Sequence, residues 1–193
     1  MGFAGRESWQ VSHGTSRAVT TALFLRDTLA LSVDTVPELP GLDPGVPVVV
    51  PAGVDRAAAA GEWLGWWADV LDHARAGSPP DDPSDVPDDP SGTSLRVRPA
   101  LRAAVLALRP AAADHHRRTA ASPQALPIGE VVRGVEHRLG RHVRPFRLVI
   151  TEVPVRGPVW ERATAAHVIA SRHFLGDPAL SAPALRAAVE ALA

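Results

Sequence analysis

The sequence predicts an α+β fold in which helices pack with a small antiparallel sheet formed by the C-terminal third of the chain. Three observations support this class. Apolar side chains recur three and four residues apart in residues 17–31, 55–76 and 129–142, the spacing of a helix face. Apolar and polar residues alternate from Phe146 to Thr151, the spacing of a half-buried strand. Proline and aspartate crowd residues 77–93, where we expect a disordered acidic loop.

The first predicted helix covers residues 17–31. Ser16 precedes it and is a favourable N-cap, since its hydroxyl can accept a free amide of the first turn. The stretch Val19–Leu25 is also compatible with a strand, but the helical spacing favours a helix. Residues 1–15 are polar and contain glycine and serine, so we expect a flexible N-terminus there.

The second predicted helix begins after Asp55, which can cap it, and ends at Gly77. The side chains expected on its buried face are Leu64, Trp67, Leu71 and Ala74, widened by Trp63 and Val70. Trp66 points about 100° away from Trp67 and shares a face with charged residues, so we expect it at the surface.

The rest of the chain predicts two more helices, a sheet and a closing helix. One helix covers residues 99–109 and ends before Pro110, and a loop over 110–127 leads to the helix 129–142. The strand from Phe146 reaches Val155, where Arg156-Gly157 resembles a hairpin turn. Residues 158–175 fit either two strands or a helix, and strands are favoured because the helical stripe is poor. A last helix spans 182–192.

Composition limits the possible chemistry. The chain has 193 residues, 46% of them apolar, which suits a single domain over 1–193. Cys, Lys, Asn and Tyr are missing, which excludes disulfides, thiolate or lysine nucleophiles and cysteine-based metal sites. The missing Lys, Asn and Tyr indicate a GC-rich bacterial genome, since their codons are AT-rich. The apolar stretch 18–31 is broken by Arg26 and Asp27, so we expect neither export nor a membrane span, and a cytoplasmic location.

Charge is divided unevenly along the chain. Residues 1–94 carry 14 acidic side chains and 5 arginines, whereas residues 95–148 carry 3 acidic side chains and 11 arginines. Such asymmetry is compatible with a nucleic-acid surface on the arginine-rich middle. It is equally compatible with the two parts pairing with each other, which we favour because the overall charge is only −1.

One candidate catalytic site follows from the predicted hairpin. In that register Glu152 faces Glu161, and His167 on a third strand joins them. Two carboxylates and an imidazole are suited to acid–base chemistry or to a divalent metal. This predicts a hydrolase or metal-dependent enzyme as an alternative function, although two solvated glutamates explain the pattern more simply.

The other candidate is a binding surface. Trp66 and Trp63, together with Arg138, Arg141 and Arg144 at i, i+3 spacing, are residue types that anchor protein interfaces. The first hypothesis is therefore a non-enzymatic protein-interaction or accessory module that binds another protein or a second copy. Nucleic-acid binding through the arginines is a further alternative. No cofactor and no metal are expected, because phosphate-loop, dinucleotide and zinc motifs are absent.

Overall fold

The computed structural model describes residues 9–34, 37–76, 86–119 and 125–193. The helices within these residues are α1 (Arg17–Thr28), α2 (Arg56–Ala76), α3 (Thr93–Arg96), α4 (Pro99–Thr119), α5 (Ile128–Leu139), α6 (Arg172–Gly176) and α7 (Pro178–Leu192). The strands are β1 (Gln10–Thr15), β2 (Arg147–Val153), β3 (Trp160–Thr164) and β4 (His167–Ser171). The α+β class is confirmed.

The sheet is mixed and not antiparallel, which corrects the prediction. Its strand order is β1-β2-β4-β3, and β1, β2 and β4 run parallel while β3 is antiparallel to β4. The edge strand β1 comes from the N-terminal segment that was expected to be flexible. It pairs with β2 along its whole length, from Gln10 opposite Arg147 to Thr15 opposite Glu152. A polar six-residue segment gives little local signal for a strand, and its order comes from this long-range pairing. Residues 1–8 lie outside the described part of the chain.

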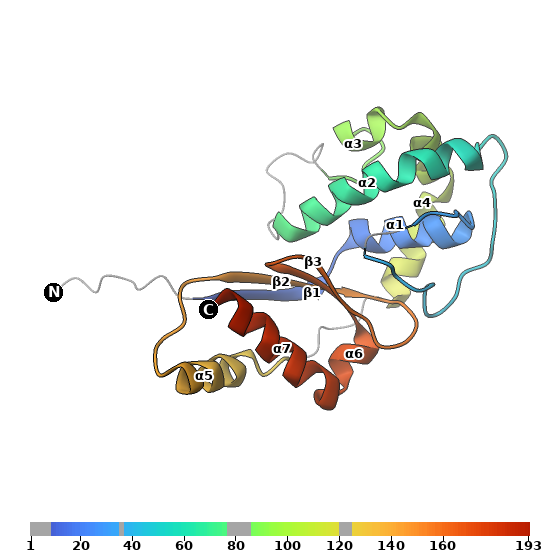
Figure 1. Cartoon of the computed structure of the whole chain (residues 1–193). Helices are drawn as coiled ribbons and strands as arrows, with labels where there is room; N and C mark the ends of the chain where they lie inside the picture. Colours follow the sequence, from blue (N-terminus) through green and yellow to red (C-terminus); the bar gives the residue numbers. More distant parts are fainter. Residues whose placement is uncertain (1–8, 35–36, 77–85, 120–124) are drawn as a thin grey trace.

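The sheet is the middle of three layers (Figure 1). The helices α1, α2 and α4 lie on one side of it, and α5 and α7 cover the other. Successive side chains of β2 serve the two layers in turn, as a pleated strand requires. Leu148 and Ile150 pack with α5 and α7, whereas Val153 joins the core of the helical layer.

The buried face of α2 differs from the predicted one. Trp66 is fully buried and Leu64 is 46% exposed, the reverse of the expectation for both. The residues that α2 buries are Ala59, Trp63, Trp66, Trp67, Val70 and Ala74. Tertiary contacts rotate the buried stripe toward Trp66, because the chain around Pro87 packs against its ring.

In residues 86–93 the structure corrects the expected disordered loop over 77–93. Residues 77–85 lie outside the described residues, but residues 86–93 are packed. The Trp66 indole N–H donates to the Pro87 carbonyl at 2.7 Å. Asp88 is buried and accepts from Arg17 Nε at 2.9 Å, which ties the segment to the start of α1.

The acidic and basic parts of the chain contact each other along α2. Glu62 accepts the backbone N–H of Leu101 at 2.9 Å, so a side chain of α2 caps the N-terminus of α4. Arg98, just before α4, donates to Asp69 of α2 at 2.7 Å. Some of the arginine-rich middle is therefore paired within the chain, as the mutual-pairing hypothesis predicts.

The structure corrects some of the predicted element boundaries and confirms others. The helix expected to end before Pro110 continues through it as α4 to Thr119, because its extension buries Ala112 and His115. The predicted loop over 110–127 is therefore helical in its first half. The N-cap roles of Ser16 and Asp55 are confirmed, since each side chain accepts an amide of the following first turn.

The segment after β2 forms strands, as favoured, but not the expected hairpin. β4 lies between β2 and β3, so the connection around Gly157 crosses the end of β4 instead of joining neighbouring strands. Ser171 at the end of β4 binds this connection: its hydroxyl donates to the Gly157 carbonyl and accepts the Val159 amide. Among the described helices, none combines the length and apolarity that crossing a bilayer would need.

Candidate functional site

The best-formed pocket lies where the parallel strands end. Its volume is about 330 Å³. Thr15 ends β1, Glu152 and Val153 end β2, and Arg172 directly follows β4, so all three parallel strands contribute to its wall. The carboxyl edge of parallel strands is the usual place for a ligand site in open sheets, because the chain leaves this edge in loops and helix starts.

The helical layer supplies the opposite wall. His116, Arg118 and Thr119 come from the last turn of α4, and Thr20 comes from α1. Asp43 and Pro44 of the α1–α2 connection complete the rim. The pocket thus lies between the helical layer and the sheet, and neither part could form it alone.

Glu152 is the most deeply buried ionisable group of this wall, with 2% of its side chain exposed. Its oxygen Oε1 accepts a hydrogen bond from Arg172 Nε at 2.7 Å, and Nη2 of the same guanidinium group forms an ion pair with Oε1, also at 2.7 Å. Its oxygen Oε2 lies 3.3 Å from His13 Nε2 on the neighbouring strand β1. That approach lacks hydrogen-bond geometry, and both Oε2 and His13 Nε2 are buried with no hydrogen-bond partner among the described residues.

Opposing influences act on the pKa of this carboxyl group. Burial by itself would raise the pKa of Glu152. The contacts with His13 and Arg172 and the positive charge of Arg172 outweigh burial and hold it below its usual value. Glu152 is therefore a carboxylate at neutral pH, a buried acceptor of hydrogen bonds.

His116 is a second polar group of the pocket without a full set of partners. Its Nδ1 atom is buried and has no hydrogen bond among the described residues. Burial lowers the pKa of His116, and the nearby Arg17 charge lowers it further against the opposing effect of Asp88. The imidazole is neutral at pH 7 and offers the pocket either a donor or an acceptor.

The structure does not bring the predicted trio of Glu152, Glu161 and His167 together, so that site is wrong as a constellation. Glu152 is paired with Ala170 of β4, whereas Glu161 is paired with Ile169. Ala170 and Ile169 are consecutive, so the two glutamates leave opposite faces of the sheet. His167 is buried and its Nε2 contacts Thr151 Oγ1 at 2.9 Å.

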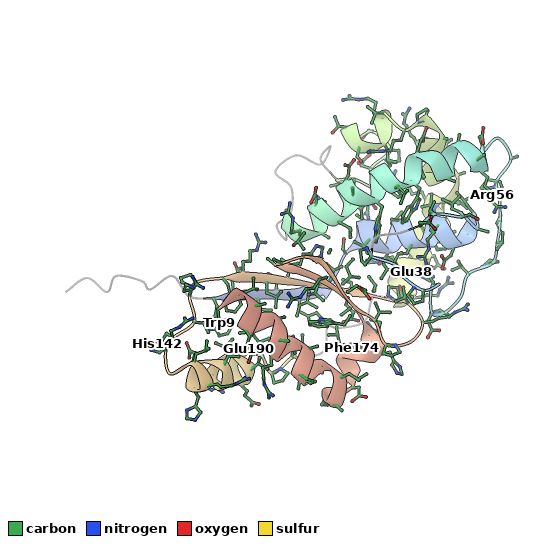
Figure 2. All side chains as sticks on the ribbon, in the orientation of Figure 1. Trp9, Glu38, Arg56, His142, Phe174 and Glu190 are labelled. Carbon is green, nitrogen blue, oxygen red and sulfur yellow. The ribbon has the colours of Figure 1, made fainter. Side chains whose placement is uncertain are left out.

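The predicted binding residues occupy other environments. Trp63 and Trp66 are fully buried, so the expected surface role of Trp66 is wrong. Arg138 pairs with Glu190 of α7, and Arg144 Nε donates to the Ala193 backbone oxygen at 3.0 Å. Arg141 also reaches that oxygen. His142, beside these arginines, lies at the opposite end of the sheet from Phe174 of α6, so the arginines are remote from the pocket (Figure 2).

The sequence did not indicate the pocket residues Arg172, His116 and Arg118. The only hint for β1 was that the segment Val11–Thr15 runs directly into the cap Ser16, as a strand followed by a helix does. Recognising it would have placed Thr15 at a strand end. Within residues 9–34, 37–76, 86–119 and 125–193, no cluster of three or more His, Asp or Glu is close enough to hold a metal ion.

Comparisons with models of protein families, with curated proteins and with solved structures give no match for this chain. The function is therefore argued from the chemistry of the pocket.

Proposed function

We propose that the protein binds a small anionic molecule in the pocket between the sheet and the helical layer. The observation that carries this proposal is the buried pair of Glu152 and Arg172 at the carboxyl edge of the parallel strands. Burying a carboxylate costs free energy because the group loses its hydration. Buried charged pairs that line a pocket are therefore more common at functional sites than elsewhere.

The arginines give the pocket its preference for an anion. Arg172 uses Nε and Nη2 on Glu152, and these contacts fix the plane of its guanidinium group at the pocket wall. Arg118 lines the pocket from α4, and its side chain is 64% exposed; its ion pair with Asp114 is at the surface and therefore weak enough for a ligand anion to replace. Guanidinium groups bind carboxylates and phosphates through paired donors, which supports an anionic group on the ligand.

The size of the pocket limits the ligand. Its volume of about 330 Å³ is at the low end of the range of roughly 300–1,000 Å³ that is typical of small-molecule sites. This supports a compact metabolite, and a dinucleotide is too large.

Two neighbouring arginines of α4 provide a matched test. Arg117 and Arg118 both pair with Asp114, at 3.1 and 2.6 Å, and both are largely exposed. Arg118 lines the pocket, whereas Arg117 is not among its lining residues. The probes are inorganic phosphate and succinate, titrated into ¹⁵N-labelled protein and followed by NMR.

We expect either anion to shift resonances of the pocket residues, and Arg118→Gln to weaken that binding about tenfold, because it removes one charged contact. Arg117→Gln should leave the affinity within about twofold. Equal losses in both variants would indicate a nonspecific effect of surface charge, and shifts confined to residues outside the pocket would refute the proposal.

A further inference from the structure

The unpaired polar atoms of Glu152 and His116 indicate a second property of the ligand, in addition to its charge. This step rests on the proposed function and concerns the same pocket. We infer that the ligand is a hydroxylated anion, whose hydroxyl group donates a hydrogen bond to Oε2 of Glu152 while its anionic group lies against the arginines.

The buried carboxylate of Glu152 has more hydrogen-bonding capacity than its neighbours fill. Each carboxylate oxygen has two lone pairs. Oε1 of Glu152 accepts a hydrogen bond from Arg172 Nε and lies 2.7 Å from Nη2 of the same guanidinium group, so Arg172 engages this oxygen. Oε2 accepts none among the described residues although it is buried. An acceptor left without a partner in such a place is energetically unfavourable, so a ligand that supplies a donor is favoured.

His13 does not remove this requirement. Its Nε2 lies 3.3 Å from Oε2 outside hydrogen-bond geometry. Even a reoriented imidazole would fill only one of the two lone pairs of Oε2. One lone pair of Oε2 therefore lacks a donor from His13 in every orientation of the imidazole.

The groups around Glu152 make a hydroxyl group the donor that fits best. A cationic amine would meet Arg172 and Arg118 in the same small pocket, and like charges repel. A hydroxyl group donates to the carboxylate without adding charge. It can also accept a hydrogen bond in return, which His116 Nδ1 provides in its protonated tautomer. A hydroxyl group close to a carboxylate or phosphate thus satisfies both unpaired atoms and the arginines together.

Two matched pairs of compounds test the inference with the unmodified protein. L-malate differs from succinate by one hydroxyl group, and glycerol 3-phosphate differs from propyl phosphate by two. The first pair tests a carboxylate as the anion and the second a phosphate. We expect the hydroxylated member of at least one pair to bind about tenfold more tightly, the effect of one hydrogen bond to a charged acceptor.

Glu152→Gln then identifies the acceptor, since the amide keeps the shape of the side chain. This variant should reduce the preference for the hydroxylated compound to within about twofold. If Glu152→Gln does not fold, the affinities of the two compound pairs for the unmodified protein still test the inference.

Equal affinity within both pairs would overturn the inference, while a loss in Arg118→Gln that Arg117→Gln does not share would leave the proposed anion site intact. A preference that persists in Glu152→Gln would also overturn it, because the hydroxyl group would then bind elsewhere. If none of the four compounds binds, both the inference and the proposed anion site fail.

Discussion

At the scale of single residues, burial decides between structural and functional roles. Trp66 looked like an interface anchor because its helical neighbours are charged. In the folded chain its ring is fully buried and its N–H bonds the Pro87 carbonyl. Glu152, which the sequence grouped with Glu161 and His167 in a candidate catalytic site, is instead buried in the pocket wall beside Arg172.

We expect Trp66→Ala to lower the free energy of unfolding by about 3–5 kcal/mol, since it leaves a large cavity and an unpaired carbonyl. Urea denaturation measures this directly. Leu64→Ala on the same helix is the matched control, because Leu64 is 46% exposed and should change stability by less than about 1 kcal/mol. A stable Trp66→Ala protein with weakened self-association would restore the surface role.

His167 makes stability depend on pH. Burial, with a smaller effect of Arg75, lowers the pKa of His167 to about 4, against its usual 6.5. Above pH 6.5 both the folded and unfolded forms are neutral, so pH has no effect through this group. Between pH 6.5 and 4 only the unfolded chain takes up the proton, and stability falls by about 3 kcal/mol.

Urea midpoints recorded across this pH range should therefore fall less steeply for His167→Gln than for the unmodified protein. The slope will not vanish, because burial also lowers the pKa values of His115 and His116. An unchanged slope in His167→Gln would show that His167 takes up its proton without unfolding.

At the scale of elements, side chains from one element complete the ends of another. Glu62 of α2 caps α4, and Ser171 at the end of β4 caps α6 by accepting the Phe174 amide. The cap of α4 comes from a side chain of another helix, and the cap of α6 comes from the last residue of the preceding strand. Such contacts fix how the elements meet, and through α4 they place His116 and Arg118 at the pocket.

Glu62→Ala should destabilise the protein by about 1 kcal/mol, the usual cost of a lost helix cap. Asp72→Ala is the control, since Asp72 also lies on α2 but pairs only with the exposed Arg75 at 3.1 Å. Equal unfolding free energies for the two variants would show that the cap contributes nothing. In addition, chemical shifts of the α4 amides should change in Glu62→Ala alone.

At the scale of the whole molecule, the sheet joins two cores. The core of the helical layer includes Val153, Val155 and Ile169 from the sheet segment, while Ile150 and Val168 of the same strands pack with α5 and α7. Because β2 and β4 contribute to both cores, neither core can lose its packing without disturbing the other.

The chain should consequently unfold in one transition. Tryptophan fluorescence, which reports mainly on α2, and far-ultraviolet circular dichroism should give the same urea midpoint. Two separated transitions would mean that the helical layer and the sheet fold independently, contrary to a single domain over 1–193.

Local sequence is enough to predict the features that depend on near neighbours. The cap of α1 at Ser16, the cap of α2 at Asp55 and the alternation of β2 all follow from spacing and caps within a few residues, whereas residues 158–175 fitted both strands and a helix. The α+β class follows from these elements together.

Features that depend on distant partners became visible only in the folded chain. β1 is a strand because β2 pairs with it, Trp66 is buried because Pro87 returns over it, and α4 continues past Pro110 because α1 buries its last turns. The pocket combines residues from Thr15 to Arg172, and no local pattern records that meeting. Contacts across such distances are set by which surfaces pack together, a property of the whole chain and not of any one segment.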